Sequence, residues 1–239
     1  ISAKTVGVSG SDQAVTNAGR GDELAYQLAK LGKELKRDME FANIGVENAK
    51  AAGASGTARE SASVGTWYGG NIAGTSTSAS NFSTNGSPSA SPAGTGATAI
   101  AGGTNRTFTE ALLKAGLKKC YELGGNPDVV LMSASHKQLA SAFSGVATLY
   151  KNADDKTVIG AVDVYVSDFG EVSFVPDRHQ QANRVDILEM DKWEVSYLRP
   201  FQTKDLASSG DNDKKLLLTE WTLTARSPNA NYGIFNLTA

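Results

Sequence analysis

The stretch GDELAYQLAKLGKELKRDMEFANI, residues 21–44, has the clearest periodicity in the chain. Four leucines recur at intervals of four, three and four residues: Leu24, Leu28, Leu31 and Leu35. This spacing places them on one side of an α-helix, and Ala42 keeps the same register. The remaining positions carry charged side chains that are mixed in sign and nearly neutral in sum. The pattern predicts a long amphipathic helix that lies across a surface through a narrow apolar side and is solvated on the other.

Residues 1–10, which precede this helix, have the alternation of an extended strand. Val6 and Val8 share one face, and small or polar residues occupy the other. A single strand is not stable alone and needs a partner. We expect that partner to be a part of the protein upstream of Ile1 or another subunit.

A long segment after the helix is free of charge. No charged residue occurs between Glu60 and Arg106, and Gly, Ser, Thr and Ala dominate residues 70–104. Such a segment has too few large apolar side chains to form a core of its own that would offset the entropy lost on ordering. We therefore expect this connection to lie against another surface, with a neighbouring subunit as the natural candidate.

The rest of the chain predicts a compact α/β unit followed by strands. Thr107 and Glu110 match a capping box, and Ser135 and Gln138 match a second one, so a helix is expected after each. The first of these helices has an apolar side and ends at the glycines of residues 124–125. Strands are expected over residues 128–132, 162–166, 172–174, 185–188, 193–198, 215–225 and 232–237, with a polar loop over 205–213.

Composition excludes several classes of protein. The 239 residues carry 23 basic and 25 acidic side chains, a formal net charge of −2, and one cysteine. The length suits one large domain or two small ones. No apolar run reaches the roughly 18 residues of a transmembrane helix. A single cysteine excludes a disulfide framework and a Cys-based zinc site. The isoelectric point of about 5.8 argues against a protein whose main role is to bind phosphates.

The candidates for nucleophilic or acid–base chemistry are few. His136 follows Ser133 and Ser135 closely, and His179 falls in a polar turn, but neither has a third group in sequence that would orient its imidazole. Cys120 lies on the apolar side of its helix and is expected to be a buried, inert thiol. These residues predict no catalytic site.

Candidate ligand-binding patterns are equally weak. The glycines of residues 94–99, GTGATA, fit a dinucleotide-binding loop, but the strand before it and the helix after it that such a loop requires are not predicted. The acidic residues at 154–155 and 211–213 lack the ligand spacing and distal glutamate of a calcium loop. We therefore expect no cofactor and no metal ion.

Three stretches resemble the major capsid proteins of tailed bacteriophages, which have the Hong Kong 97-type fold, in their residue identities as well as in their periodicity. The first is GRGDELAYQLAK (residues 19–30) continuing to ELKRDME (34–40), which is similar to the family's spine helix. The second is FTEALLK (108–114) with GGNPD (124–128). The third is AVDVYVSDFG (161–170) followed by YLRPF (197–201).

This resemblance implies an α+β fold with a long spine helix, a P-domain sheet, an A-domain α/β core and an extended E-loop. Its implied segments are the descending part of the E-loop (1–13), the spine helix of the P-domain (14–60), the Gly/Ser/Thr/Ala-rich connection (61–105), the A-domain (106–190), the P-domain strands (191–228) and a return strand to the A-domain (229–239). The family's N-terminal arm and ascending E-loop strand have no counterpart here, so we expect maturation cleavage, a truncation or a part outside the given sequence. The connection is also longer than is usual in the family.

The resemblance also implies contacts between subunits. The E-loop of the family lies over a neighbouring subunit, which makes Thr5, Val6 and Val8 the candidate inter-subunit contacts. Some relatives form a covalent crosslink between a lysine and an asparagine. Lys4 is the only lysine in the implied E-loop, and nothing in the sequence assigns it that chemistry.

The implied function is that of a structural virion protein, the major capsid subunit. Copies of it would self-assemble as hexamers and pentamers into an icosahedral shell that encloses double-stranded DNA without sequence-specific binding. Further implied partners are a portal protein and decoration or scaffolding proteins, with no membrane; assembly would take place in the cytoplasm of the host bacterium. Two alternatives are another phage assembly subunit, such as a tail or decoration protein, and a small hydrolase that uses Ser, His136 or His179, and Asp.

Overall fold

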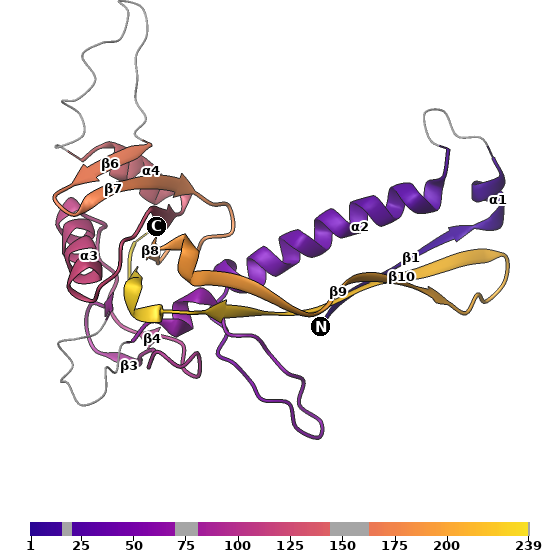
Figure 1. Ribbon diagram of the computed structural model, residues 1–239, viewed down its shortest axis with the longest axis horizontal. Coiled ribbons are helices and arrows are strands. Elements are labelled where there is room, and N and C mark those ends of the chain that lie inside the picture. Colours follow the sequence, from indigo (N-terminus) through magenta and orange to yellow (C-terminus); the bar gives the residue numbers. More distant parts are fainter. Residues whose placement is uncertain (16–20, 70–80, 144–162, 239) are drawn as a thin grey trace, which may run out of the picture. The chain divides into compact units, whose positions relative to one another are not determined.

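The computed structural model describes residues 1–15, 21–69, 81–143 and 163–238, and the chain in it divides into two compact units (Figure 1). Unit 1 comprises residues 1–42 and 195–222, and unit 2 comprises residues 43–194 and 223–239. The chain therefore passes between the units three times, and each unit is built from segments that are far apart in sequence.

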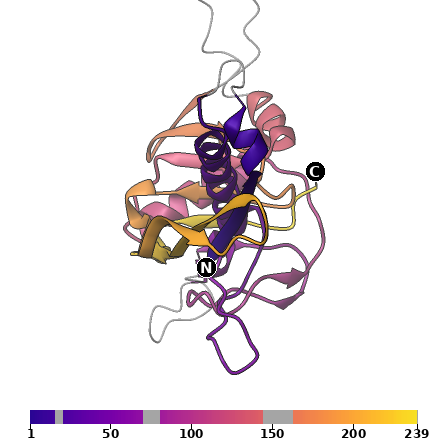
Figure 2. The same cartoon turned by 90° about the vertical axis from the view of Figure 1, so that its right-hand side faces the viewer.

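Unit 1 is a three-stranded sheet with two helices. The strand order is β1 (Ser2–Ser9), β10 (Asn212–Ala225) and β9 (Trp193–Leu206), so β9 and β1 are the edges. Helix α1 (Gly10–Ala14) follows β1, and α2 (Glu23–Glu40) packs along β1. Figure 2 shows α2 nearly end-on, with β1 beside it. Strand β1 runs antiparallel to β10, with Ser2 opposite Thr219. The expectation that β1 pairs with an upstream segment or another subunit is therefore wrong, because its partner belongs to the same chain.

Helix α2 confirms the periodicity of residues 21–44. Asp22 caps its first turn by accepting a hydrogen bond from the backbone N–H of Ala25 at 3.1 Å. Leu24, Leu35 and Met39 on its apolar side are buried. The regular helix ends at Glu40 and continues as one wider π-helical turn, η1 (Phe41–Gly45). Residues 19 and 20 of the quoted capsid-like stretch lie outside the described residues.

Unit 2 contains a six-stranded mixed sheet. Its strand order is β2 (Phe82–Ser83), β11 (Tyr232–Ile234), β8 (Val185–Leu188), β5 (Val129–Met132), β7 (Gly170–Pro176) and β6 (Val164–Ser167). Strands β5 and β7 are parallel, whereas β8 is antiparallel to both β5 and β11. The remaining elements are helices α3 (Glu110–Glu122) and α4 (Ala134–Ser141), a small sheet of β3 (Pro88–Ala90) and β4 (Ala101–Gly102), and the 3₁₀ turns η2 (Val64–Trp67), η4 (Met190–Lys192) and η5 (Pro228–Ala230).

The main hydrophobic core lies between α3, α4 and this sheet. The apolar side of α3 is fully buried there through Leu113, Leu117 and Cys120. Gly116 allows α3 to approach the sheet closely, because a Cβ atom at this position would lie 2.5 Å from Cδ1 of Ile187. The predicted burial of Cys120 is thus confirmed, and its neighbours are core side chains.

Several predicted element boundaries differ from the structure. Helix α3 begins at Glu110 after Thr109, whose side chain makes no capping bond, so the Thr107–Glu110 capping box is wrong. Glu110 instead accepts hydrogen bonds from Lys114 and Tyr165. Helix α4 is capped by Ser133 rather than Ser135.

The strands also differ in length from the predictions. Strand β9 runs eight residues beyond the expected end, through Pro200, and the loop that joins it to β10 is only five residues long (207–211). A proline is tolerated there because β9 is an edge strand, where one missing N–H costs no ladder bond. Strand β11 stops at Ile234, and Asn236 soon afterwards has φ of 59°. The predicted hairpin is confirmed as β6 and β7, while its first residue, Val162, lies outside the described residues.

The described parts of the charge-free connection, residues 61–69 and 81–105, lie against unit 2 of the same chain. Strand β2 adds to the six-stranded sheet beside β11. The side chain of Asn81 is fully buried and donates to the backbone oxygens of Pro228 and Asn231 at 2.6 and 2.9 Å. The expectation of a supporting surface is met by the chain itself, and a contact of this connection with a neighbouring subunit stays a prediction.

Candidate assembly surfaces and a buried charge network

Strand β1 presents one face to α2. Lys4 Nζ lies 3.2 Å from Glu34 Oε2 and 2.8 Å from Asp38 Oδ2, both on α2. Hydrogen bonds to these two carboxylates, Asp38 first, raise the pKa of Lys4. Since side chains alternate along a strand, Val6 and Val8 share this face with Lys4. The strand is thus held to the helix within unit 1 by a two-carboxylate bridge.

The three sequence-predicted contact residues consequently lie in different surroundings. Val8 is 6% exposed, Val6 is half-buried, and Thr5 on the opposite face is exposed. In the single chain Val8 is already covered, whereas Thr5 is open to a partner. Their role as inter-subunit contacts stays a prediction.

Strand β9 is the most open apolar element of unit 1. None of its 14 residues, all within the described ranges, is buried. Leu198 is 75% exposed, Tyr197 is 47% exposed, and the Tyr197 and Phe201 rings lie 6.1 Å apart on one face. An exposed edge strand with large apolar side chains is a surface that a second chain can cover.

The core of unit 1 is correspondingly thin. Its buried apolar side chains in the described residues come from β1, α2 and the middle of β10: Val8, Leu24, Leu35, Met39, Leu217 and Leu218. Two 14-residue strands and an 18-residue helix therefore bury little on their own. Burial against neighbours would supply what this unit lacks.

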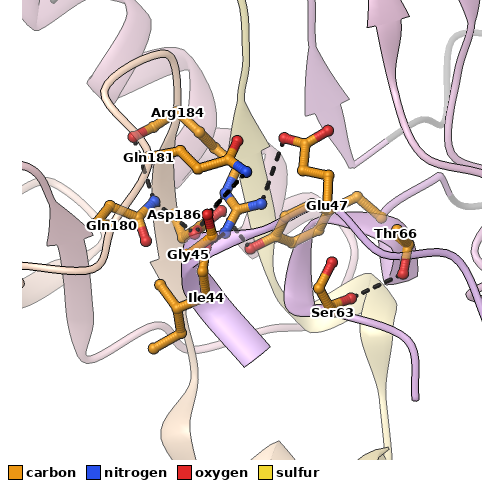
Figure 3. A network of polar contacts seen from close by, with 10 residues as sticks. Ile44, Gly45, Glu47, Ser63, Thr66, Gln180, Gln181, Arg184 and Asp186 are labelled. Atoms are coloured by element: carbon orange, nitrogen blue, oxygen red, sulfur yellow. Dashed lines mark hydrogen bonds and ion pairs between the residues drawn. The ribbon is translucent and has the colours of Figure 1, made fainter. Parts of the chain in front are cut away.

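A charge network is buried in unit 2 around Arg184, which has no solvent exposure (Figure 3). Its Nε–H donates to Asp186 Oδ2 at 2.9 Å, and its Nη2 donates to the backbone oxygen of Ile44 at 2.9 Å. Its Nη1 lies 3.4 Å from Glu47 Oε1. Asp186 also accepts from the Tyr68 hydroxyl and from Gln180, at 2.9 and 2.8 Å. The guanidinium thus has two carboxylate partners and one carbonyl.

This network fastens the segment after α2 onto unit 2. Arg184 holds the carbonyl of Ile44, and Gln181 Nε2 donates to the carbonyl of Gly45 at 3.2 Å. Space for the guanidinium depends on Gly65, because a Cβ atom there would lie 2.3 Å from Nη1 of Arg184. The arrangement is a structural clamp, since all three nitrogens of the Arg184 guanidinium have oxygen partners within the protein.

Burial sets the protonation behaviour of the network. Burial raises the pKa of Glu47, with the Arg184 charge opposing the shift and the Asp186 charge adding to it. Burial, and then the Asp186 charge, raises the pKa of Tyr68 well above its usual value. Burial alone would lower the pKa of Arg184, but Asp186 and Glu47 outweigh it and raise the pKa. Tyr68 is therefore a neutral donor and Arg184 a permanent cation.

The residues considered for catalysis do not form a reactive site. His136 is fully buried, its Nδ1 lies 2.8 Å from Ser133 Oγ, and burial lowers its pKa. Ser133 also accepts from the backbone N–H of His136 as the cap of α4, so this pair is a helix start within the core. The backbone N–H of His179 donates to Asp177 at 3.0 Å in a turn. Burial raises the pKa of Cys120 to about 12, which keeps its thiol protonated.

The sequence patterns considered for ligand binding have structural surroundings or lie outside the described residues. The glycines of residues 94–99 lie in bends with no helix after them, and a Cβ atom at Gly96 would lie 2.9 Å from Cβ of Ala62. Gly96 therefore serves close packing. No cluster of three or more His, Cys, Asp or Glu side chains suited to a metal ion occurs within residues 1–15, 21–69, 81–143 and 163–238. The acidic pair at 154–155 lies outside them. In the described part of the chain, no helix is both long and apolar enough to cross a membrane.

Comparison with known proteins decides which class of molecule has these surfaces. A family model for the SU10 major capsid protein matches residues 1–238. The chain belongs to the SU10 major capsid protein family. Its resemblance to tailed-phage capsid proteins is thereby confirmed, and the protein is a capsid shell subunit located in the virion. No curated protein sequence matches the chain.

Solved structures share the fold of this capsid protein at low sequence identity. The capsid of cyanophage A-1(L) is 15% identical with a TM-score of 0.64, covering 99% of this chain and 77% of that one. The SrpI encapsulin complex of Synechococcus elongatus is 12% identical with a TM-score of 0.55, covering 99% and 73%. The procapsid of satellite phage P4 is 11% identical with a TM-score of 0.54, covering 99% and 70%. The chain thus has a mixed helix-and-sheet fold of the phage capsid type, as the sequence predicted.

Sequence reasoning missed the Arg184 network in this capsid protein. The strand over residues 185–188 was predicted, but the meaning of its charged residues was not. A signal was present, because Asp186 interrupts an otherwise apolar strand and follows Arg184 by two residues. A charged pair at such spacing within a buried strand indicates an internal ion pair, since unpaired buried charges are unstable.

Proposed function

We propose that this capsid subunit assembles as hexamers and pentamers into an icosahedral shell that encloses double-stranded DNA. In this proposal, residues 1–13 are the descending part of the E-loop, residues 14–60 the spine helix region and residues 191–228 the P-domain strands. Residues 61–105 connect to an A-domain over 106–190, to which 229–239 return. A portal protein and decoration or scaffolding proteins complete the particle, which assembles in the host bacterial cytoplasm. The contribution of the chain is association energy rather than chemistry, so no enzymatic activity is part of the proposal.

The exposed apolar surface of β9 supports this proposal most directly. A subunit that folds with Leu198 and Tyr197 in water leaves apolar area for a neighbour to bury, and fully burying a leucine side chain is worth about 1.5–3 kcal/mol. In a closed symmetric shell each subunit repeats the same contact, so a moderate contact adds up over many copies.

The first test is direct observation of the assembled state. Purified full-length chain should form closed shells visible by negative-stain electron microscopy and should sediment as large particles. Tubes would point to a tail protein, and a monomer at all protein concentrations would point to a decoration protein; either result would contradict the proposal.

A substitution in β9 tests the observation that carries the proposal. Leu198→Asp removes a side chain that is 75% exposed in the single subunit, so the subunit should still fold, with an unchanged circular dichroism spectrum. Assembly should fail, because a carboxylate would have to be desolvated in an apolar contact. The control, Thr203→Asp, adds the same charge to the same strand without removing a large apolar side chain and should assemble. Equal shell yields from both variants would show that β9 is not an assembly contact.

A further inference from the structure

Two acids and four bases of α2 lie on different parts of the helix surface, which the near-neutral sum of its sequence does not show. The acidic residues Glu34 and Asp38 border β1, where both are bridged by Lys4 at 3.2 and 2.8 Å. The bases Lys30, Lys33 and Arg37 are exposed on another part of the surface. Because the apolar side of the helix is buried, these bases lie on the side that faces solvent.

Lys33 stands at the centre of a cluster of cations, which we call the basic face: Lys30, Lys33, Lys36 and Arg37. Residues three and four apart are neighbours on a helix surface. The neighbours of Lys33 at these spacings are Ala29, Lys30, Lys36 and Arg37, and none is acidic. Like charges at such spacing destabilise a helix by about 0.2–0.5 kcal/mol per pair.

Two acids of α2 are three or four residues from members of the basic face: Glu34, which is bridged to Lys4, and Glu40. Within the described ranges no ion pair involves Lys33, Lys36 or Arg37, although Glu40 lies one turn beyond. Lys30 lies over the ring of Tyr26, 4.5 Å from its centroid, which orients a cation without cancelling its charge. The contrast with α3 is sharp, because the lysines of that helix are all paired with glutamates.

We propose that the basic face of α2 binds the phosphodiester backbone of nucleic acid, an inference that rests on the proposed enclosure of DNA by the shell. Seven residues separate Lys30 from Arg37, which is about 10 Å along a helix that rises about 1.5 Å per residue. Duplex DNA carries one negative charge per about 1.7 Å with both strands counted, so this length of duplex carries roughly six phosphates. Lysine and arginine contacts of this kind carry no sequence information, which suits a shell that holds any genome.

The acidic isoelectric point of the whole chain does not oppose such a contact. The electrostatic potential at a surface depends on how charges are distributed, and a local group of four cations attracts phosphate whatever the net charge of −2. The proposal requires that this side of α2 borders the interior of the shell. An acidic segment of a second subunit is the competing occupant.

The test compares two variants of the full-length chain that remove equal charge. K30Q/K33Q/R37Q removes three bases of the basic face, and K114Q/K118Q/K119Q removes three paired bases of α3. Binding of a fluorescently labelled DNA duplex is measured by anisotropy as salt is raised from about 50 to about 200 mM. Each lost phosphate contact lowers the slope of log affinity against log salt by about 0.9. The α2 variant should therefore lose about 2.7 from this slope, and the α3 variant less than about 1.

The remaining outcomes separate this inference from the proposed function. Equal slopes for the wild type and the α2 variant would overturn the inference, as would a shell reconstruction that places the basic face on the outside. Loss of shell formation by the α2 variant in the absence of DNA would also overturn it, in favour of an acidic protein partner. Shell formation by the wild type is scored separately by electron microscopy, so failure of the proposed function would be visible there and not in the salt slopes.

Discussion

Replacing Arg184 by methionine tests the structural role of the buried charge network. The change removes the cation but keeps an unbranched side chain of similar length. Asp186, with no exposed side-chain surface, and Glu47, with 11% exposed, would then be buried carboxylates without a cationic partner. Removing one partner from a buried ion pair costs about 3–5 kcal/mol, because the remaining charge is desolvated without compensation. That is a large share of the roughly 5–15 kcal/mol that holds a typical domain folded.

The quantity to measure is the free energy of local opening of β8. Hydrogen exchange followed by mass spectrometry reports the free energy of opening for peptides that cover Val185–Leu188. A loss of about 3–5 kcal/mol would accelerate their exchange by roughly two to three and a half orders of magnitude, at about 1.4 kcal/mol per tenfold change. Peptides that cover residues 44–47 should lose protection in parallel, since the carbonyl of Ile44 also loses its donor.

A surface ion pair of matching geometry provides the control. Arg199 Nε lies 2.7 Å from Glu220 Oε2, close to the 2.9 Å of the Arg184–Asp186 pair, but the two side chains are 40% and 20% exposed. Arg199→Met should therefore cost only about 0.2–1 kcal/mol. If both substitutions had the same small effect on their own strands, burial would not be the source of the stability of the network. The triple variant R184M/D186N/E47Q should regain most of the loss, because no buried charge remains; an equally unstable triple variant would also refute the electrostatic reasoning.

Two further predictions concern protonation. Burial raises the pKa of Glu47 above its usual value of 4.5, so its contribution to stability is fully present below pH 4.5 and is lost as pH rises through the raised pKa. The stability of the wild type minus that of Glu47→Gln, from urea unfolding at a series of pH values, should therefore fall as pH rises; a flat or rising difference would contradict this. Cys120, buried and with a pKa of about 12, should react with a thiol reagent at neutral pH only as fast as unit 2 opens. Rapid labelling of the folded chain would show that the thiol is accessible, and labelling in urea provides the positive control.

Local patterns accounted for the elements whose stability is local. The leucine spacing of residues 21–44 predicted α2, because a helix is stabilised by contacts three and four residues apart. The alternation around Asp168 predicted the hairpin of β6 and β7 for the same reason, since a hairpin brings neighbours in sequence together. The capping box at Thr107 was wrong because Glu110 binds Tyr165, which is 55 residues away in sequence.

The same difference between contacts local in sequence and contacts distant in sequence applies to the candidate sites. The sequence around His136 did not show that Ser133, and not Ser135, is the residue that caps the helix there. The partner of β1 was missed because nothing within residues 1–10 specifies that Ser2 pairs with Thr219, more than 200 residues later. The owner of the surface beneath residues 81–105 was missed for the same reason, since Asn81 binds backbone oxygens about 150 residues away.

The amino-acid sequence by itself determined the helix of residues 21–44, the alternation of the main strands and the likeness to phage capsid proteins. Only the tertiary structure decided that β1 completes a sheet with β10, that Arg184 is buried between two carboxylates, and that Glu34 and Asp38 of α2 bind Lys4 while the bases of the helix face solvent. The physical reason is that helices and hairpins depend on neighbours in sequence, whereas strand pairing, burial and the sorting of charge depend on contacts whose partners are set by topology.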